Sequence, residues 1–236
     1  MRISPYALAA LGLFVSSANA QQFLPVCTLP SSTVQAVQSQ LATVVQAADH
    51  NGGLLSPNLM WSAIVDRNGT LCSVIKSGDA FPYSRAIAIA KAETANGFSN
   101  SKIALSTANL YGPSLPGGSL FGLNNTNPFN SFDNALVPGP GLGTGVGFNP
   151  GGVATFGGGV ALYSGGQVIG GLGVSGDTAC ADHAIAFRMR RAAGFDGTPG
   201  AVGADNISYY PLGATVATLN PLLFSHPHCT LNDITP

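Results

Sequence analysis

The stretch that decides the fold covers residues 157–195 and reads GGGVALYSGGQVIGGLGVSGDTACADHAIAFRMRRAAGF. Apolar and small residues run through 160–163, two glycines interrupt them, and a second apolar run covers 168–174. This pattern predicts two strands joined by a tight turn. Beyond the second run, apolar side chains recur at helical spacing, and Asp177 or Thr178 can cap that helix. The stretch therefore predicts a hairpin that leads into a helix through a glycine bend.

The glycine bend, residues 170–176, is the first candidate for a ligand site. Gly173 and Gly176 carry no side chain, so a flat molecule or another backbone can approach closely. The N-terminus of the helix that follows offers N–H donors to a carboxylate or a phosphate. The alternative interpretation is that these glycines only permit tight packing of the strands.

A second block, residues 61–99, has the same organisation: WSAIVDRNGTLCSVIKSGDAFPYSRAIAIAKAETANGFS. It predicts strands at 59–66 and 70–75 around an Asn-Gly turn, and then an alanine-rich helix at 81–97. An apolar stripe from Val34 to Ala48 predicts a further helix, which Ser31 or Ser32 can cap and Asn51-Gly52-Gly53 ends. Strand pairs joined by tight turns, with helices before and after them, predict an α/β (α+β) fold whose sheet is mainly antiparallel.

Together the two blocks resemble the GlcG/HbpS family of haem-binding and glycolate-operon proteins. The resemblance covers residues 31–106 and 157–195. It implies a profilin-like fold. It also implies binding of haem or another tetrapyrrole, for transport, storage or sensing of haem and iron, in a homo-oligomer.

Residues 1–20 have the form of a secretory signal peptide. Arg2 precedes an apolar run at 7–15, and the segment ends with Ala18-Asn19-Ala20, a small-residue cleavage site. The apolar run is too short to span a bilayer, so no stable membrane insertion is expected. The sequence therefore predicts a secreted or periplasmic protein.

The composition favours one domain, residues 21–236, and excludes some classes of partner. The chain has 31 glycines and 16 prolines, but its 45% apolar content argues against disorder. Basic residues are few, and their only cluster is Arg188, Arg190 and Arg191, so no nucleic-acid partner is expected.

Two segments of this domain lie outside the family-like blocks. Residues 111–150 form a Gly/Pro-rich insertion, whose phenylalanines supply apolar surface for a lid or a subunit contact, or pin the loop to its own core. Residues 196–236 form a C-terminal extension, in which 207–212 predicts an edge strand.

Four cysteines in an exported chain favour two disulfides, for which three pairings exist. We favour Cys27 with Cys72 and Cys180 with Cys229, because each bridge would tie a flanking segment to the family-like core.

The second bridge would bring three histidines together. His183 lies one helical turn beyond Cys180, and His226 and His228 precede Cys229 at the other end of the bridge. Such a cluster could ligate a divalent metal, or one imidazole could ligate haem iron. The alternative for His183 is a helix histidine hydrogen-bonded to a neighbouring carbonyl.

The charged residues of the two blocks are the remaining candidates. Arg85 and Lys91 could hold a haem propionate or a small carboxylate, or they could lie on solvated helix faces. The predicted ligand-binding residues are Asp66, Arg85, Lys91, Gly173, Gly176, Asp182 and His183.

These observations favour an exported haem-binding protein and leave two other hypotheses open. One is an enzyme that acts on a small carboxylate or carbonyl compound, with His183 and Asp182 for proton transfer. No nucleophile elbow, zincin motif or CxxC motif supports it. The other is a non-catalytic oligomeric module assembled through the Gly/Pro loop.

Overall fold

The computed structural model describes residues 26–55, 58–130, 146–201, 203–215, 218, 220 and 223–236. The predicted signal peptide, residues 1–20, lies outside this part of the chain. The strands are β1 (Trp61–Asp66), β2 (Leu71–Lys76), β3 (Gly159–Ser164) and β4 (Gln167–Ser175). The helices are α1 (Ser31–Gln38), α2 (Leu41–Val44), α3 (Ser84–Gly97), α4 (Tyr111–Ser114) and α6 (Ala179–Ala192), with short 3-10 turns η1 (His50–Gly52) and η2 (Leu123–Asn125).

The four strands form one sheet in the order β2-β1-β4-β3, and every neighbouring pair is antiparallel. Gly69 turns β1 into β2, and Gly165 and Gly166 turn β3 into β4, all three with positive φ. Thr178 caps α6, because its hydroxyl accepts the N–H of Ala181. The predicted α+β fold with its antiparallel sheet is confirmed.

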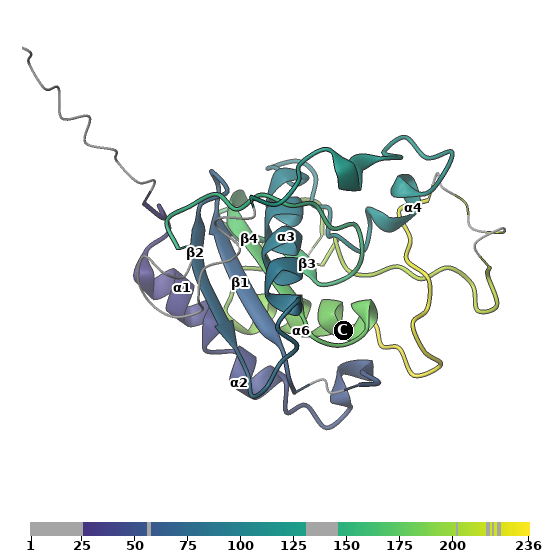
Figure 1. Ribbon diagram of the computed structural model, residues 1–236, viewed down its shortest axis with the longest axis horizontal. Coiled ribbons are helices and arrows are strands. Elements are labelled where there is room, and N and C mark those ends of the chain that lie inside the picture. The colour runs from purple at the N-terminus through teal and green to yellow at the C-terminus, as the bar shows by residue number, and fades with distance from the viewer. Residues whose placement is uncertain are drawn as a thin grey trace, which may run out of the picture.

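Helices cover both faces of the sheet (Figure 1). α3 packs on one face, where Ala88, Ile89 and Ala92 meet the side chains of Trp61 and Val65. α1, α2 and α6 pack on the other face. The core there includes Val37, Leu41, Ile64, Leu162, Leu172, Ile185 and Met189. The alternation of apolar residues along each strand explains both layers, because successive side chains point to opposite faces.

α1 is shorter than the predicted first helix. Pro30 is its N-cap, so neither Ser31 nor Ser32 caps it, and the helix ends at Gln38. The hydroxyl of Ser39 bonds back to the carbonyl of Ala36, a local bond that competes with helix continuation.

Glycines in the central strand bring α3 against the sheet. A Cβ atom at Gly173 would overlap the carbonyl oxygen of Ala88, and one at Gly171 would overlap that of Ala92. The backbone of α3 therefore lies where strand side chains would otherwise stand. The alternative interpretation of tight packing holds for both glycines.

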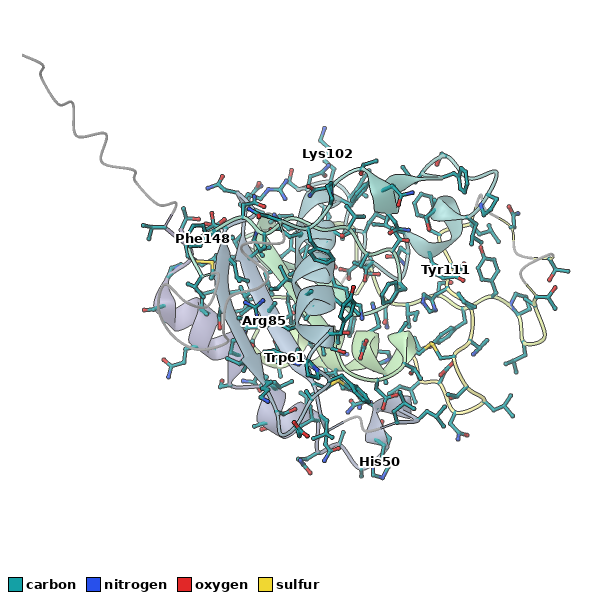
Figure 2. The ribbon with its side chains drawn as sticks, in the orientation of Figure 1. His50, Trp61, Arg85, Lys102, Tyr111 and Phe148 are labelled. Carbon is teal, nitrogen blue, oxygen red and sulfur yellow. A yellow bond between two sulfur atoms is a disulfide. The ribbon has the colours of Figure 1, made fainter. Side chains whose placement is uncertain are left out.

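The insertion contacts the edge strand β2 through two backbone hydrogen bonds to Leu71. The N–H of Leu71 donates to the carbonyl of Phe148, and the N–H of Gly147 donates to the carbonyl of Leu71. Figure 2 accordingly places Phe148 beside the start of β2. Residues 131–145 of the insertion lie outside the described part.

The C-terminal extension is fastened to α6 by a buried ion pair. The two terminal guanidinium nitrogens of Arg190, Nη1 and Nη2, donate to the carboxylate of Asp205 at 2.5 and 2.7 Å, and both side chains are fully buried. The predicted edge strand at 207–212 is wrong, because the structure has only an isolated bridge between Tyr209 and His226.

Two of the three clustered arginines of α6 form ion pairs within the fold. Arg190 is buried, and Arg188 pairs with Asp49 at 2.6 Å. Across the described residues, no helix is both long enough and apolar enough to cross a membrane.

Candidate functional site

A buried ion pair joins two of the predicted ligand-binding residues. The Nζ atom of Lys91 lies 2.6 Å from Oδ2 of Asp182, with 0% and 2% of the two side chains exposed. The other oxygen, Oδ1, accepts the N–H groups of Gly176 and Asp177 at 3.0 and 2.9 Å. Lys91 also donates to the carbonyl of Val174 at 3.1 Å. The glycine bend thus directs its amides at Asp182, a carboxylate of the chain itself.

Burial governs the charges of this pair. It lowers the pKa of Lys91 and raises the pKa of Asp182 to about 6, while each partner's charge opposes the shift of the other. The ring of Phe156 lies 4.7 Å from Lys91 Nζ and covers the ammonium group. The interpretation of a solvated helix face is wrong for Lys91, whose counter-charge in this structure is Asp182.

Asp66 is also buried, and it organises the turn between β1 and β2. Its carboxylate accepts the N–H groups of Asn68 and Thr70, and on the other side the N–H and hydroxyl of Thr28. Arg85, in the first turn of α3, is buried, and burial lowers its pKa. The structure therefore brings Lys91, Gly176 and Asp182 together, and it leaves Asp66 with a different set of partners.

His183 is completely buried on α6. Its Nε2 accepts the N–H of Ile207 at 3.1 Å, and burial lowers its pKa to about 3. Asp182 faces Lys91 instead, so neighbours in sequence point to different partners. His183 is therefore a hydrogen-bonded, buried helix histidine, but its backbone partner is the N–H of Ile207 and not a neighbouring carbonyl.

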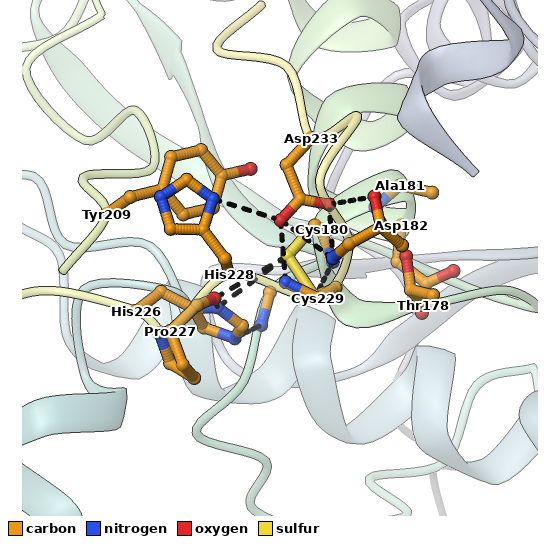
Figure 3. The surroundings of a disulfide bond; sticks show 12 residues. Thr178, Cys180, Ala181, Asp182, Tyr209, His226, Pro227, His228, Cys229 and Asp233 are labelled. Atoms are coloured by element: carbon orange, nitrogen blue, oxygen red, sulfur yellow. Dashed lines mark hydrogen bonds and ion pairs between the residues drawn. A yellow bond between two sulfur atoms is a disulfide. The ribbon is translucent and has the colours of Figure 1, made fainter. Parts of the chain in front are cut away.

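His226 is buried as well, next to the Cys180–Cys229 bridge (Figure 3). Its Nδ1 lies 2.7 Å from the carbonyl of Pro227, and its Nε2 accepts the N–H of Gly157 at 3.3 Å. Burial lowers its pKa to about 4, so the ring is neutral at physiological pH. Both ring nitrogens are occupied by backbone groups.

His228 differs from these two because part of it reaches solvent. Its side chain is 28% exposed, and its ring stacks on Tyr209 with centroids 4.4 Å apart. Nδ1 lies 3.3 Å from the buried carboxylate of Asp233 (Figure 3). Within the described residues, Nε2 has no hydrogen-bond partner. The carboxylate thus fixes one nitrogen of the ring and leaves the other available.

His228 lines a pocket in the C-terminal extension. The pocket has a volume of about 290 Å³, and its wall includes Leu212 and Leu231, which are 67% and 91% exposed. We call it the His228 pocket; it is lined by residues 210–214 and 227–231.

Both favoured disulfides are present. Cys27 bonds to Cys72 and Cys180 bonds to Cys229, with Cα atoms 5.2 and 6.0 Å apart. Asp233 holds the second bridge in place, because it accepts the N–H of Cys229 at 2.6 Å.

The predicted metal cluster of His183, His226 and His228 does not assemble among the described residues. The groups of three close ligand atoms there are Cys180, His226 and Cys229, and Cys27, Asp66 and Cys72. All four cysteines are oxidised and cannot act as thiolate ligands.

Sequence reasoning did not identify Asp233 and Tyr209, the two residues that contact the ring of His228. Asp233 lies five residues beyond it in an irregular tail, and Tyr209 lies nineteen residues before it. No motif or periodicity links these positions, so the sequence carried no signal for them.

Comparison with known proteins agrees with the fold and places the chain in a family. A family model described as "Haem degrading protein HbpS-like" matches residues 33–190, most of the chain. No curated protein sequence matches.

Two solved structures share the fold at a TM-score of 0.50 or more. PduOC in a haem complex superposes with a TM-score of 0.52 and 25% sequence identity, over 72% of this chain and 98% of PduOC. Klebsiella pneumoniae protein ORFY gives a TM-score of 0.50 and 23% identity, over 71% of this chain and 92% of its own. A double mutant of Streptomyces reticuli HbpS gives 0.43 and 20%, over 81% and 96%.

The family match spans both sequence blocks, from α1 through most of α6, and so covers the whole sheet and its helices. The chain belongs to the HbpS-like family.

Proposed function

We propose that the chain is an exported haem-binding protein, with a role in the transport, storage or sensing of haem or iron. The observation that carries this proposal is the haem complex of PduOC, which shares the fold and 25% of its sequence with this chain. Membership of a family described as haem-degrading supports the same ligand. Two disulfides suit an oxidising compartment and support export.

We propose His228 as the iron ligand, because it is the histidine whose geometry suits the task. An imidazole that ligates a metal commonly offers one nitrogen while a carboxylate holds the other. His228 meets this condition through Asp233, whereas the ring nitrogens of His226 bond to backbone groups and His183 is fully buried. His50 is exposed but lies at the periphery of the molecule (Figure 2).

The His228 pocket fits one edge of a porphyrin better than a whole one. Its volume of about 290 Å³ lies at the small end of the range for ligand pockets. Exposed Leu212 and Leu231 extend the apolar surface beyond it. Haem would therefore lie across the mouth of the pocket, against these leucines. When bound, haem would supply iron redox and ligand-exchange chemistry, which the side chains of this pocket lack.

A haemin titration tests the proposal. The oxidised protein is titrated with haemin while the Soret band is recorded, together with His228→Ala, His183→Ala and the control His50→Asn. Asn suits the control because His50 has a positive φ, which Asn tolerates. We expect a saturable 1:1 shift in the wild type and in His50→Asn, and at least a tenfold weaker affinity in His228→Ala.

The variants separate the remaining outcomes. Loss of binding in His183→Ala alone, with a native circular dichroism spectrum, would move the ligand to α6 and require that buried region to open. A wild type without a saturable shift would remove haem binding as the function.

A further inference from the structure

A second pocket lies on the opposite side of the sheet from α6, where three segments meet. It has a volume of about 340 Å³. The C-terminal half of α3, the β1–β2 turn and the insertion form its walls. We call it the Glu93 pocket; its polar and aromatic lining includes Arg67, Asn68, Glu93, Phe98, Asn127 and Asn149. It shares no residue with the His228 pocket.

Glu93 is the only glutamate of the chain, and its carboxyl group lacks a full set of partners. Oε1 is buried and has no hydrogen-bond partner among the described residues. Burial, and then the charge of Asp66, raises the pKa of Glu93 to about 8, so the group is mainly protonated at pH 7. A protonated carboxyl offers both an O–H donor and an acceptor. A buried polar atom without a partner destabilises the protein, and a ligand hydroxyl that reached the carboxyl group of this partly buried, pocket-lining residue would remove that cost.

Glycine at position 69 makes room for this carboxyl group. A Cβ atom there would lie 2.8 Å from Oε2 of Glu93 and 2.5 Å from the amide nitrogen of Asn149. Gly69 also has a φ of +80°, so the turn and the pocket both require glycine.

The wall of the pocket has spare hydrogen-bonding groups around Glu93. Within the described residues, the side-chain amides of Asn68 and Asn127 have no hydrogen bond. Arg67 uses Nη1 on Asn96, with the side-chain oxygen at 3.0 Å, which holds the guanidinium group at the rim. The half-buried ring of Phe98 provides an apolar surface beside these groups.

We propose that the Glu93 pocket binds a neutral, polyhydroxylated ligand of monosaccharide size. Amide and carboxyl groups each present a donor and an acceptor side by side, which matches neighbouring hydroxyls of a sugar. The apolar face of a sugar ring would pack on Phe98. Arg67 disfavours a cation here, and the negative charge of Asp66 disfavours an anion deep in the pocket.

The test observes Glu93 by NMR, because a chain with one glutamate gives one glutamate carboxyl signal. Protein labelled with 13C at the glutamate carboxyl shows a single side-chain resonance, which reports on Glu93 alone. It is produced in a bacterial host, so that Asn68 in its Asn-Gly-Thr sequon carries no glycan. D-glucose, D-galactose and N-acetyl-D-glucosamine are titrated at pH 6.5. We expect at least one to shift the resonance saturably.

Paired variants check that the pocket is the site, with affinities measured by calorimetry. Glu93→Gln keeps a donor and an acceptor and should stay within about threefold of the wild type, whereas Glu93→Ala should lose at least tenfold. Asn127→Ala should also weaken binding, and Asn125→Ala, two residues away and outside the lining, should not.

Two results would overturn the proposal. One is the absence of any saturable shift with all three sugars. The other is a saturable shift with acetate or methylamine in their place, since the pocket would then select an ion. Neither result bears on the haemin titration, because the two pockets are separate.

Discussion

At the scale of single residues, Lys91 and Asp182 illustrate how a buried charge depends on its partner. Lys91→Met would leave Asp182 buried without a cation, and we expect it to cost about 3–5 kcal/mol of the free energy of unfolding. Lys91→Met with Asp182→Asn should recover most of this loss, since Asn keeps an acceptor for the amides of Gly176 and Asp177. Urea denaturation of the two variants measures the difference. Equal stability of the single and double variants would contradict a coupled pair.

Glu93 should make stability depend on pH. Unfolded Glu93 ionises near its ordinary pKa of 4.5, but in the folded protein its pKa is about 8. The folded state therefore binds more protons between these values, and its stability falls as pH rises from about 4.5 to about 8. Each pKa unit corresponds to about 1.4 kcal/mol.

Glu93→Gln tests this dependence, because glutamine does not titrate. The melting temperature of the variant should exceed that of the wild type by several degrees at pH 8.5, and the gap should narrow at pH 5. A gap that stays constant with pH would show that Glu93 has an ordinary pKa. The 13C titration of the single glutamate resonance gives the pKa directly.

At the scale of elements, the contact between α3 and β4 depends on glycine. Gly173→Ala would place a Cβ atom against the carbonyl oxygen of Ala88, so α3 would have to move away from the sheet. We expect a loss of about 3 kcal/mol or more in the free energy of unfolding. Gly97→Ala is the control. It lies in α3 with no atom within 4 Å of its Cβ position, and it should be neutral or stabilising by up to about 1 kcal/mol.

The elements were largely predictable from sequence, and the sites were not. Period-two and period-3.6 patterns located all four strands and both long helices, because local sequence records which face of an element is buried. Glycine has no side chain, so Gly173 fitted a ligand site and a packing contact equally well. Lys91 and Asp182 lie far apart in sequence, and only the fold reveals that they pair. His228 lies in a tail without periodicity, so no sequence pattern linked it to its partner Asp233.

At the scale of the whole molecule, the two disulfides should contribute about equally to the free energy of unfolding. Only the Cys180–Cys229 bridge should affect haemin binding. The two bridges close loops of 45 and 49 residues, for which loop entropy predicts about 4 kcal/mol each. Cys180→Ala with Cys229→Ala should also weaken haemin binding, because Cys229 follows His228 directly. Cys27→Ala with Cys72→Ala should leave haemin affinity unchanged. Thermal melts and Soret titrations measure both effects, and equal haemin affinity in the two double variants would contradict a site in the C-terminal extension.

The strand order has a consequence for how the chain is made. β1 and β4 pair at the centre of the sheet, yet about a hundred residues separate them in sequence. During synthesis the β1–β2 hairpin emerges long before its central partner, with the hydrogen-bonding edge and apolar faces of β1 open to other chains. Completion of the sheet must wait for a distant segment, which favours slow folding. A nascent chain truncated before β4 should aggregate, and efficient production should depend on holding the N-terminal half unfolded until the C-terminal half arrives.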